Sequence, residues 1–258
     1  MASAPNSLPL FYNRLEPLSS TAHGHLKART AQAAPFLAKA HAIPLTSDEF
    51  VICQRFYPIV FSVGESPVPL ALMGLNEGVN VFIDDEGKPN GELYIPAYVR
   101  RYPFMLARLR PDADELSLCF DPSSDVIGEF DDGQPLFENG KPSEATNGLL
   151  KFCEEFELSA QRTNAFMKEL ADLKLLIDGE VAIQVSDDSA PFVYRGFQMV
   201  SDERLRDMRG DELRKINQNG ILPLIIAHLF SLQLMREIFG RQVAQGKVPQ
   251  APPIPANA

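Results

Sequence analysis

The stretch PIVFSVGESPVPLALMGLNEGVNVFID, residues 58–84, decides the expected fold. It holds three short apolar runs, at 58–63, 69–75 and 80–84, separated by the segments GESP and NEG. Short apolar runs bounded by Gly, Pro and Asn are typical of strands joined by tight turns. We therefore expect an antiparallel meander here. The segment that follows, DDEGKPNG, lacks the alternating oxygen ligands of a calcium loop and is predicted to be a hairpin turn.

Helical signals flank this region on both sides. Thr46 and Glu49 have the spacing of a capping box, which predicts a helix that runs to about Phe56 and stops before Pro58. Residues 141–176 have helical periodicity, with Ser143 as the cap of a first helix and Phe166 in a second. Helical turns are also expected from residue 201 and up to Gly220, and an apolar helix from Ile221 to about Arg241.

Further strands are expected in the second half of the chain. Residues 115–121, 176–185 and 192–200 have apolar patterns typical of strands, and residues 126–140 predict a hairpin around the turn pair Asp132 and Gly133. The sequence thus predicts an α+β fold: a single domain with a largely antiparallel β-sheet packed by helices, ending in an apolar C-terminal helix. Its expected parts are an extended lead-in at 1–40, the α+β domain at 41–241 and a disordered Pro-rich tail at 242–258.

Composition narrows the class of protein. The chain has 258 residues, of which 45% are hydrophobic and 22% charged, as in globular proteins. Its formal charge of −10 repels phosphate backbones, which disfavours nucleic acid as a partner. The three cysteines form no C-x-x-C motif and lie in apolar contexts, which predicts reduced, buried thiols. The chain has no secretory signal, and the apolar run at 220–235 is too short for a membrane span, so we expect a cytoplasmic protein.

The sequence carries none of the common catalytic or nucleotide-binding motifs. The sequence has no G-x-S-x-G elbow, no Walker A loop, no G-x-G-x-x-G and no H-E-x-x-H. His23 and His25 lie on a loop without further ligands, so we predict no metal site. We also predict no cofactor and no catalytic residues, which favours a non-catalytic protein.

The stretch YIPAYVRRYPFMLARLR, residues 94–110, is basic and aromatic in an acidic chain. Pro96 suits a first helical turn, and Pro103 predicts a break, after which Phe104, Leu106 and Leu109 supply a second helical face. One interpretation makes Arg100, Arg101, Tyr98 and Tyr102 a binding site for a carboxylate or phosphate, because guanidinium groups grip planar anions and stack on rings.

The other interpretation of this double-arginine turn is structural. Aromatic residues at helical spacing are usually core, and arginine stems cover them while the charged ends meet the chain's surplus carboxylates. On this view Arg100, Arg101 and Arg108 are partners of acidic residues. The pattern favours this second interpretation.

The ordered blocks HAIPLTSDEFVICQRFYPIVFS, LALMGLNEGVNVFIDDEGKPNGELYIPAYVRRYPF, LSLCFD, GQPLFENGKPS and GILPLIIAHLFSL resemble the SapC-like family of bacterial proteins. The resemblance covers about residues 8–240. The family is named after a surface-array (S-layer) associated gene product, and its members are often encoded beside outer-membrane TonB-dependent receptors and flavin-dependent halogenases. No catalytic residues are defined for it, so the resemblance implies none here.

These observations leave three hypotheses on function. The first is a cytoplasmic accessory protein that binds a protein partner or a small-molecule ligand and is linked to a cell-surface or TonB-dependent uptake system. The second is an enzyme of unrecognised type that acts on a peptide or on a small carboxylate or phosphate, anchored by the double-arginine turn. The third is self-association into a homo-oligomer through the segment between Ile221 and Phe239.

Overall fold

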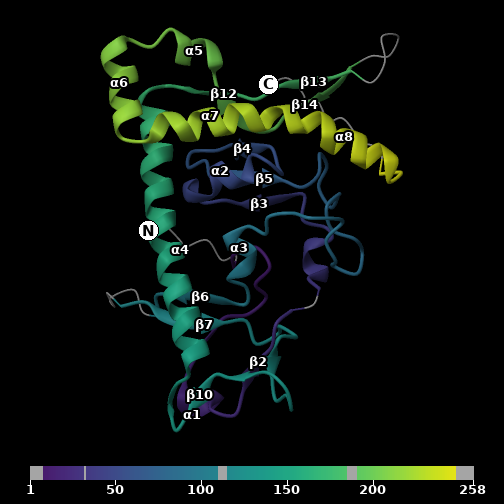
Figure 1. Ribbon diagram of the computed structural model, residues 1–258, viewed down its shortest axis with the longest axis vertical. Helices are drawn as coiled ribbons and strands as arrows, with labels where there is room; N and C mark the ends of the chain where they lie inside the picture. Colours follow the sequence, from purple (N-terminus) through teal and green to yellow (C-terminus); the bar gives the residue numbers. More distant parts are fainter. Residues whose placement is uncertain (1–7, 32, 110–114, 185–190, 248–258) are drawn as a thin grey trace. The chain divides into compact units, whose positions relative to one another are not determined.

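The chain divides into two compact units in the computed structural model, which describes residues 8–31, 33–109, 115–184 and 191–247 (Figure 1). The first unit is made of residues 1–32 and 98–158, and the second of residues 33–97 and 159–258. The α+β class is confirmed, as are the antiparallel strands and the apolar C-terminal helix. The strands of the described residues, however, form five small sheets rather than one. The predicted boundaries at residues 40 and 241 stay a prediction, and residues 248–258 of the tail lie outside the described residues.

The first unit holds three of these sheets. One has the order β1 (Glu16–Pro17), β7 (Ser117–Phe120), β6 (Phe104–Ala107), and the second has the order β8 (Ile127–Gly128), β2 (Lys27–Ala28), β9 (Gln134–Pro135). The third is the hairpin of β10 (Phe137–Glu138) and β11 (Lys141–Pro142). A short helix, α1 (Ser20–His23), lies between β1 and β2 in the chain. The segment that the sequence predicts as an extended lead-in therefore supplies a strand to two sheets.

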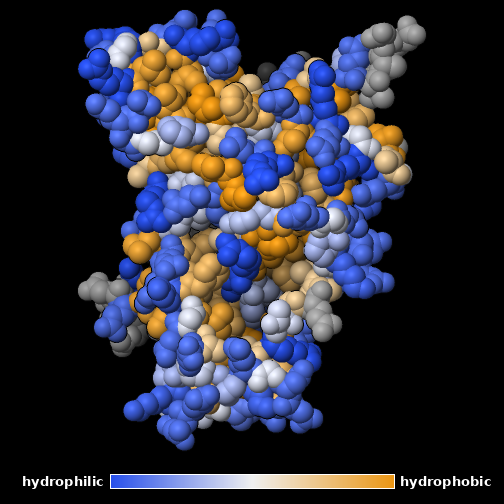
Figure 2. All heavy atoms as spheres, viewed as in Figure 1, coloured by the Kyte–Doolittle hydropathy of each residue, from blue (hydrophilic) through white to orange (hydrophobic). Residues whose placement is uncertain are grey.

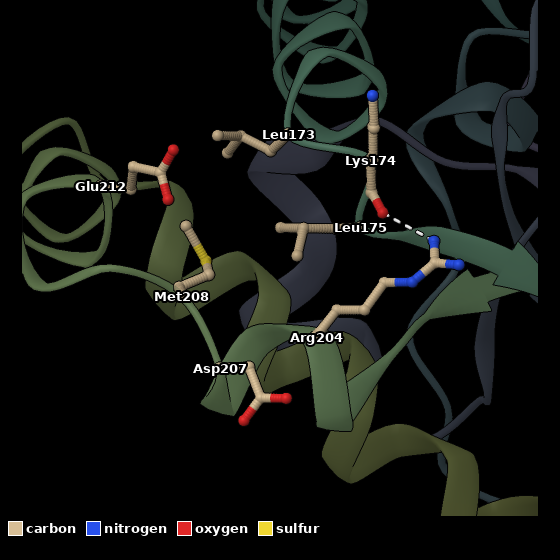
Figure 3. Close-up of a pocket in the computed structure, with 7 residues that line it drawn as sticks. All are labelled: Leu173, Lys174, Leu175, Arg204, Asp207, Met208 and Glu212. Atoms are coloured by element: carbon tan, nitrogen blue, oxygen red, sulfur yellow. Dashed lines mark hydrogen bonds between the residues drawn. The ribbon is translucent and has the colours of Figure 1, made fainter.

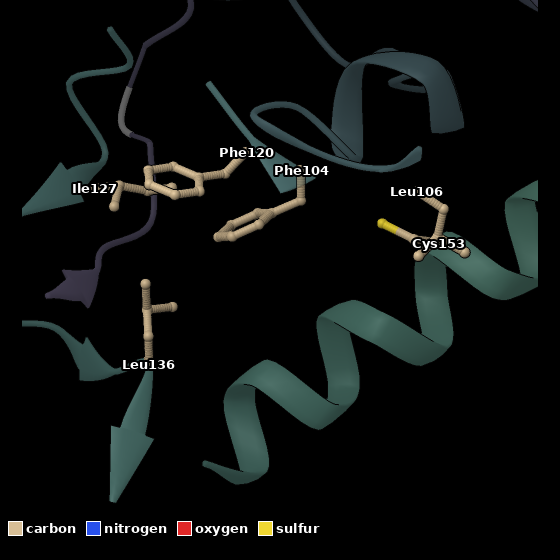
Figure 4. Close-up of a cluster of buried hydrophobic side chains, with 6 residues drawn as sticks. All are labelled: Phe104, Leu106, Phe120, Ile127, Leu136 and Cys153. Atoms are coloured by element: carbon tan, nitrogen blue, oxygen red, sulfur yellow. The ribbon is translucent and has the colours of Figure 1, made fainter. Parts of the chain in front are cut away.

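The core of this unit is a cluster contributed by its sheets, its loops and the first half of α4 (Glu144–Asp172). Figure 4 shows its members: Phe104, Leu106, Phe120, Ile127, Leu136 and Cys153. Phe104 and Leu106 alternate with half-buried residues along β6, so the segment after Pro103 is a strand, and the prediction of a second helical face there is wrong. β6 pairs with β7 over four residue pairs, which supplies the backbone hydrogen bonds that a helix would have made internally.

The second unit is built on a five-stranded antiparallel sheet with the order β12 (Leu176–Asp178), β15 (Gln198–Val200), β4 (Ile59–Phe61), β5 (Pro69–Leu72), β3 (Ala42–Pro44). A separate hairpin pairs β13 (Val181–Ile183) with β14 (Phe192–Tyr194). The first two runs of the predicted meander are confirmed as β4 and β5. The third run is not a strand. Instead Asn80 is buried there, donates to the carbonyls of Leu37 and Ala40, and accepts from two backbone N–H groups.

The helices of this unit begin where the sequence places caps. Thr46 and Glu49 form the predicted capping box at a 3-10 turn (Ser47–Glu49) that continues as α2 (Phe50–Cys53), three residues short of Phe56. Ser201 caps α5 (Asp202–Arg206), and α6 (Gly210–Gln218) follows, as predicted. The turn at Asp84 is confirmed, because its Oδ1 accepts from the N–H groups of Glu86 and Lys88. Two more 3-10 turns lie at Pro35–Leu37 and Leu232–Leu234.

The C-terminal helical segment comprises α7 (Ile221–Ser231), the turn Leu232–Leu234 and α8 (Met235–Ala244), which run end to end in Figure 1. The inner face of α7 is fixed to the sheet by two polar side chains. His228 Nε2 accepts from the N–H of Val200 at 3.0 Å, and its Nδ1 lies 2.8 Å from the carbonyl of Ile59. Ser231 Oγ accepts from the N–H of Ile59 at 2.8 Å.

These contacts join two strands that the ladder itself joins weakly. β15 and β4 are paired at one position, Gln198 opposite Phe61. His228 supplies the next link, because it binds a donor of β15 and an acceptor of β4 with one ring. Since Nε2 accepts, Nδ1 carries the proton, and the imidazole is held in the neutral form. Burial lowers the pKa of His228 to about 4, although the hydrogen bond to Ile59 acts in the opposite direction.

Candidate functional site

The double-arginine turn lies on the short helix α3 (Ala97–Arg100) and the turn that follows it. Arg101 is buried, with 6% of its surface exposed, and its guanidinium lies 4.1 Å from the ring centre of Phe156 and 4.7 Å from that of Tyr98. Its Nη1 is 3.5 Å from Glu157 Oε1, a long contact for an ion pair. Burial raises the pKa of Glu157, and the guanidinium of Arg101 opposes that rise. The charge of Arg101 is therefore only partly compensated.

One atom of this side chain is without a partner. Nε of Arg101 is buried and has no hydrogen-bond acceptor among the residues that the structure describes. A buried donor without an acceptor costs about 1–3 kcal/mol, so this nitrogen is a cost to the fold that no contact within the described chain offsets.

The other members of the predicted anion site lie apart from this guanidinium or pack against residues of the hydrophobic core. Arg100 is exposed and lies 5.2 Å above the ring of Phe152. Tyr98 donates its hydroxyl to the carbonyl of Leu10, and Tyr102 packs edge-on against Tyr12 with ring centres 5.2 Å apart. Arg101 and Tyr98 are thus brought together, whereas Arg100 and Tyr102 contact other rings. Anion binding by the four residues stays a prediction.

The histidines and cysteines that the sequence singles out have structural contacts. His23 Nδ1 accepts from the N–H of Ser19, and His25 Nε2 lies 3.4 Å from Glu129 Oε1. All three cysteines are free and buried, as predicted, and burial raises the pKa of Cys153 to about 11. In the described part of the chain, no three side chains of His, Cys, Asp or Glu lie close enough to hold a metal ion.

A cavity of about 390 Å³ lies in the second unit, where the end of α4 meets the α5–α6 segment (Figure 3). Its lining comprises Leu173, Lys174, Leu175, Arg204, Asp207, Met208 and Glu212. Arg204 is held at its wall by hydrogen bonds from Nη1 to the carbonyls of Lys174, at 2.7 Å, and Leu176, at 3.1 Å. Sequence reasoning missed this cavity, because its two walls are about thirty residues apart in the chain and neither carries a motif.

A second cavity, of about 490 Å³, lies in the first unit at the start of α4 and is lined by Gln134, Pro135, Glu138, Ser143, Glu144 and Ala145. The Ser143 side chain has a structural role there, because its Oγ accepts a hydrogen bond from the N–H of Thr146 and caps the helix, as predicted.

The outer face of α7 is apolar, unlike that of most surface helices. Leu222, Ile226 and Leu229 are half-buried along it, and Phe230 is 62% exposed. In Figure 2 apolar side chains gather at the surface beside α7, whereas α6 is covered mostly by hydrophilic ones. The predicted apolar run ends at residue 235, but the helical segment continues beyond it. The whole segment, Ile221–Ala244, has 24 residues, and the mean hydropathy of its most apolar window is 1.5. Only 33% of that window is buried.

By length and composition alone this segment could cross a membrane. That is a weak indication, because core helices of soluble proteins meet the same two criteria. The inner face of α7 argues against a membrane span, because its His228 and Ser231 hydrogen-bond to the sheet. A helix that left the sheet for a bilayer would leave these buried groups unpaired.

The geometry defines a protein of the α+β class with small antiparallel sheets, a cavity lined by both apolar and charged residues, and a partly exposed apolar helix. The described residues contain no recognisable constellation of catalytic groups. The family model described as SapC matches residues 18–238. The chain belongs to the SapC family, as the ordered blocks of its sequence indicate. No curated protein and no solved structure is significantly similar to it.

Proposed function

We propose that this SapC-family chain is a non-catalytic accessory protein that docks a protein partner through the outer face of α7. The observation that carries the proposal is an apolar strip of the half-buried Leu222, Ile226 and Leu229 and the exposed Phe230, on a helix whose inner face is hydrogen-bonded to the sheet. A contiguous exposed apolar patch on a folded protein is characteristic of an interaction site. Residues spaced at i, i+4, i+7 and i+8 supply the anchors with which helices pack on one another.

The partner is a different protein with an apolar helical segment. A second copy of the chain would bring a second charge of −10, and this like-charge repulsion opposes self-association. The cytoplasmic location and the link to a cell-surface or TonB-dependent uptake system are part of the proposal and rest on the family resemblance. A homo-oligomer formed through the segment from Ile221 to Phe239 becomes an outcome of the test.

We expect a photo-crosslinking amino acid at Phe230 to capture one discrete partner in cells of the organism that encodes the chain. The matched control is the same amino acid at Val63, which is 58% exposed and lies between β4 and β5. Phe230→Asp should abolish co-purification of that partner, whereas Val63→Asp should not. Equal products from both positions, or none from either, would contradict the proposal, and a product of twice the chain's mass would replace it with self-association.

A second candidate function is the binding of a small carboxylate or phosphate at Arg101, by a binding protein or by an enzyme of unrecognised type. The specific observation in its favour is the buried Nε of Arg101, which has no acceptor in the described chain. A guanidinium that lies close to two rings and keeps one unpaired N–H has a donor left for an oxyanion.

On this second candidate, Arg101→Met leaves the free energy of unfolding unchanged or raises it by up to about 1 kcal/mol, because an apolar isostere replaces a poorly paired buried charge. Acetate or phosphate should raise the melting temperature of the wild type but not of this variant. Arg108→Met is the control, since Arg108 is exposed and carries the same charge. A loss of more than about 2 kcal/mol in Arg101→Met, or no stabilisation of the wild type by either anion, would leave Arg101 a purely structural residue.

A further inference from the structure

The cavity between the end of α4 and the α5–α6 segment has an apolar side, formed by Leu173 and Leu175, and a facing side that carries Met208 and Glu212. Leu173 and Leu175 point toward Met208 and Glu212 across it (Figure 3). Leu175 is buried, and Leu173 and Met208 are half-buried, so the space between them is bounded largely by hydrocarbon and a thioether. At about 390 Å³, the cavity lies within the range of pockets that hold small ligands, which is roughly 300–1,000 Å³.

The two carboxylates of this cavity are free of partners. The side-chain carboxylates of Asp207 and Glu212 make no hydrogen bond or ion pair with any residue in the described part of the chain. Two other acidic residues of the same segment are paired, because Asp202 Oδ2 lies 2.5 Å from Arg206 Nη2 and Asp211 Oδ1 lies 3.1 Å from Arg209 Nε, whereas the carboxylate of Glu203 has no partner among the described residues.

The two cations of the lining form no ion pair with these carboxylates in the described part of the chain. Arg204 donates to two backbone carbonyls, which fixes its guanidinium on the side of Lys174. In Figure 3 the Lys174 side chain extends along α4, away from Glu212. Its backbone has φ of +54°, a left-handed conformation set by the end of the helix. The lining is thus balanced in formal charge, but neither of its cations is ion-paired with Glu212, which faces the apolar wall.

Glu212 has one structural explanation of its own. It lies in the first turn of α6, where a carboxylate is stabilised by the helix dipole by about 0.3–1 kcal/mol. That effect accounts for an acid on α6, but it does not account for the apolar wall that the acid faces or for the free carboxylate of Asp207. Asp211 lies in the same turn and serves as a control for the dipole.

We propose that this cavity binds a primary alkylammonium ligand, with the ammonium group at Glu212 and the methylene chain against Leu173, Leu175 and Met208. A carboxylate beside hydrocarbon selects a cation that carries an apolar chain, because each half of such a ligand meets a matching half of the cavity. The net charge of −10 favours the approach of cations. A free aliphatic amine and the side chain of a lysine share this chemistry.

Calorimetric titration of the full chain with three probes of one chain length tests the proposal. Pentylamine should bind with a stoichiometry of one, pentanol should bind at least about tenfold more weakly, and pentanoate should give no binding heat, because only the amine pairs with the carboxylate. Titration with an Nα-acetylated lysine amide shows whether a peptide-borne amine binds as well as the free amine. Binding of either amine supports the shared chemistry.

Glu212→Gln should weaken pentylamine binding about tenfold, whereas Asp211→Asn should leave it unchanged. Melting curves of both variants show whether the fold is kept. If Glu212→Gln melts early, Met208→Glu provides the second test: it adds a charge to the apolar wall and should weaken pentanol binding more than pentylamine binding. Equal binding of amine and alcohol, or equal losses in the Glu212 and Asp211 variants, would overturn the proposal. Neither result depends on docking at α7.

Discussion

Replacement of His228 by Ala should lower the free energy of unfolding by about 3–5 kcal/mol. The imidazole is fully buried and binds the N–H of Val200 and the carbonyl of Ile59. Its removal leaves both backbone groups unpaired inside the protein, at about 1–3 kcal/mol each, and opens a cavity against the ring of Phe61. Because β15 and β4 share only one ladder pair, no neighbouring contact replaces the lost link.

Urea unfolding followed by circular dichroism measures this effect. Gln233→Ala is the control, since Gln233 is an exposed residue of the same helical segment and its replacement should change the free energy of unfolding by no more than about 0.5 kcal/mol. A loss below about 1 kcal/mol for His228→Ala would mean that α7 is not fixed to the sheet as described. The proposed docking face would then lose its rigid support.

The sequence could predict the elements of this fold better than their pairing. The turn at Asp132 and Gly133 exists, and Gly133 has the left-handed φ of +104° that the turn requires. The flanking strands β8 and β9 do not pair with each other, however, because β2 lies between them and pairs with both. Nothing in residues 126–140 reveals a strand that comes about a hundred residues earlier, since strand pairing is a long-range property.

The single long helix α4 was predicted as two helices for a similar reason. The polar residues near its middle resemble a break, because Ser and Thr compete with the helix for backbone hydrogen bonds. In the fold Thr163 is buried: its Oγ1 donates to the carbonyl of Ser159 and accepts from the N–H of Ser47 at 2.8 Å. Arg162, beside it, is ion-paired with Asp48. These residues are polar because they contact the capped turn at Ser47, and not because the helix ends.

The contacts of the candidate sites could likewise be predicted only in part from the sequence. Tyr98 and Arg101 are three residues apart, so sequence periodicity could predict their contact. Phe156 and Glu157, which complete the surroundings of Arg101, come from a distant helix and could not be predicted. The exposed strip of α7 was visible as an apolar run, but its exposure depends on which face the sheet covers. The sheet takes the face that carries His228 and leaves Phe230 outside.

Acidification should destabilise the second unit between about pH 6.5 and pH 4 through this same histidine. His228 has an ordinary pKa of 6.5 in the unfolded chain and a pKa of about 4 in the fold. Within that window the unfolded state binds more protons than the native state, so stability falls as the pH falls. A difference of this size is worth about 3 kcal/mol once the pH is below both values. The physical cause is direct: a proton on Nε2 removes the lone pair that accepts the N–H of Val200.

The difference in the free energy of unfolding between the wild type and His228→Gln isolates this effect, because glutamine can accept a hydrogen bond but does not titrate. Other groups also act as the pH falls. Burial lowers the pKa of His41, which destabilises the fold in the same direction, whereas the raised pKa of Glu157 acts in the opposite direction. Both contributions are common to the two proteins and cancel in the difference. Urea unfolding at several pH values should show the wild type losing about 3 kcal/mol more than the variant, and parallel curves would show that His228 is not held neutral between β15 and β4.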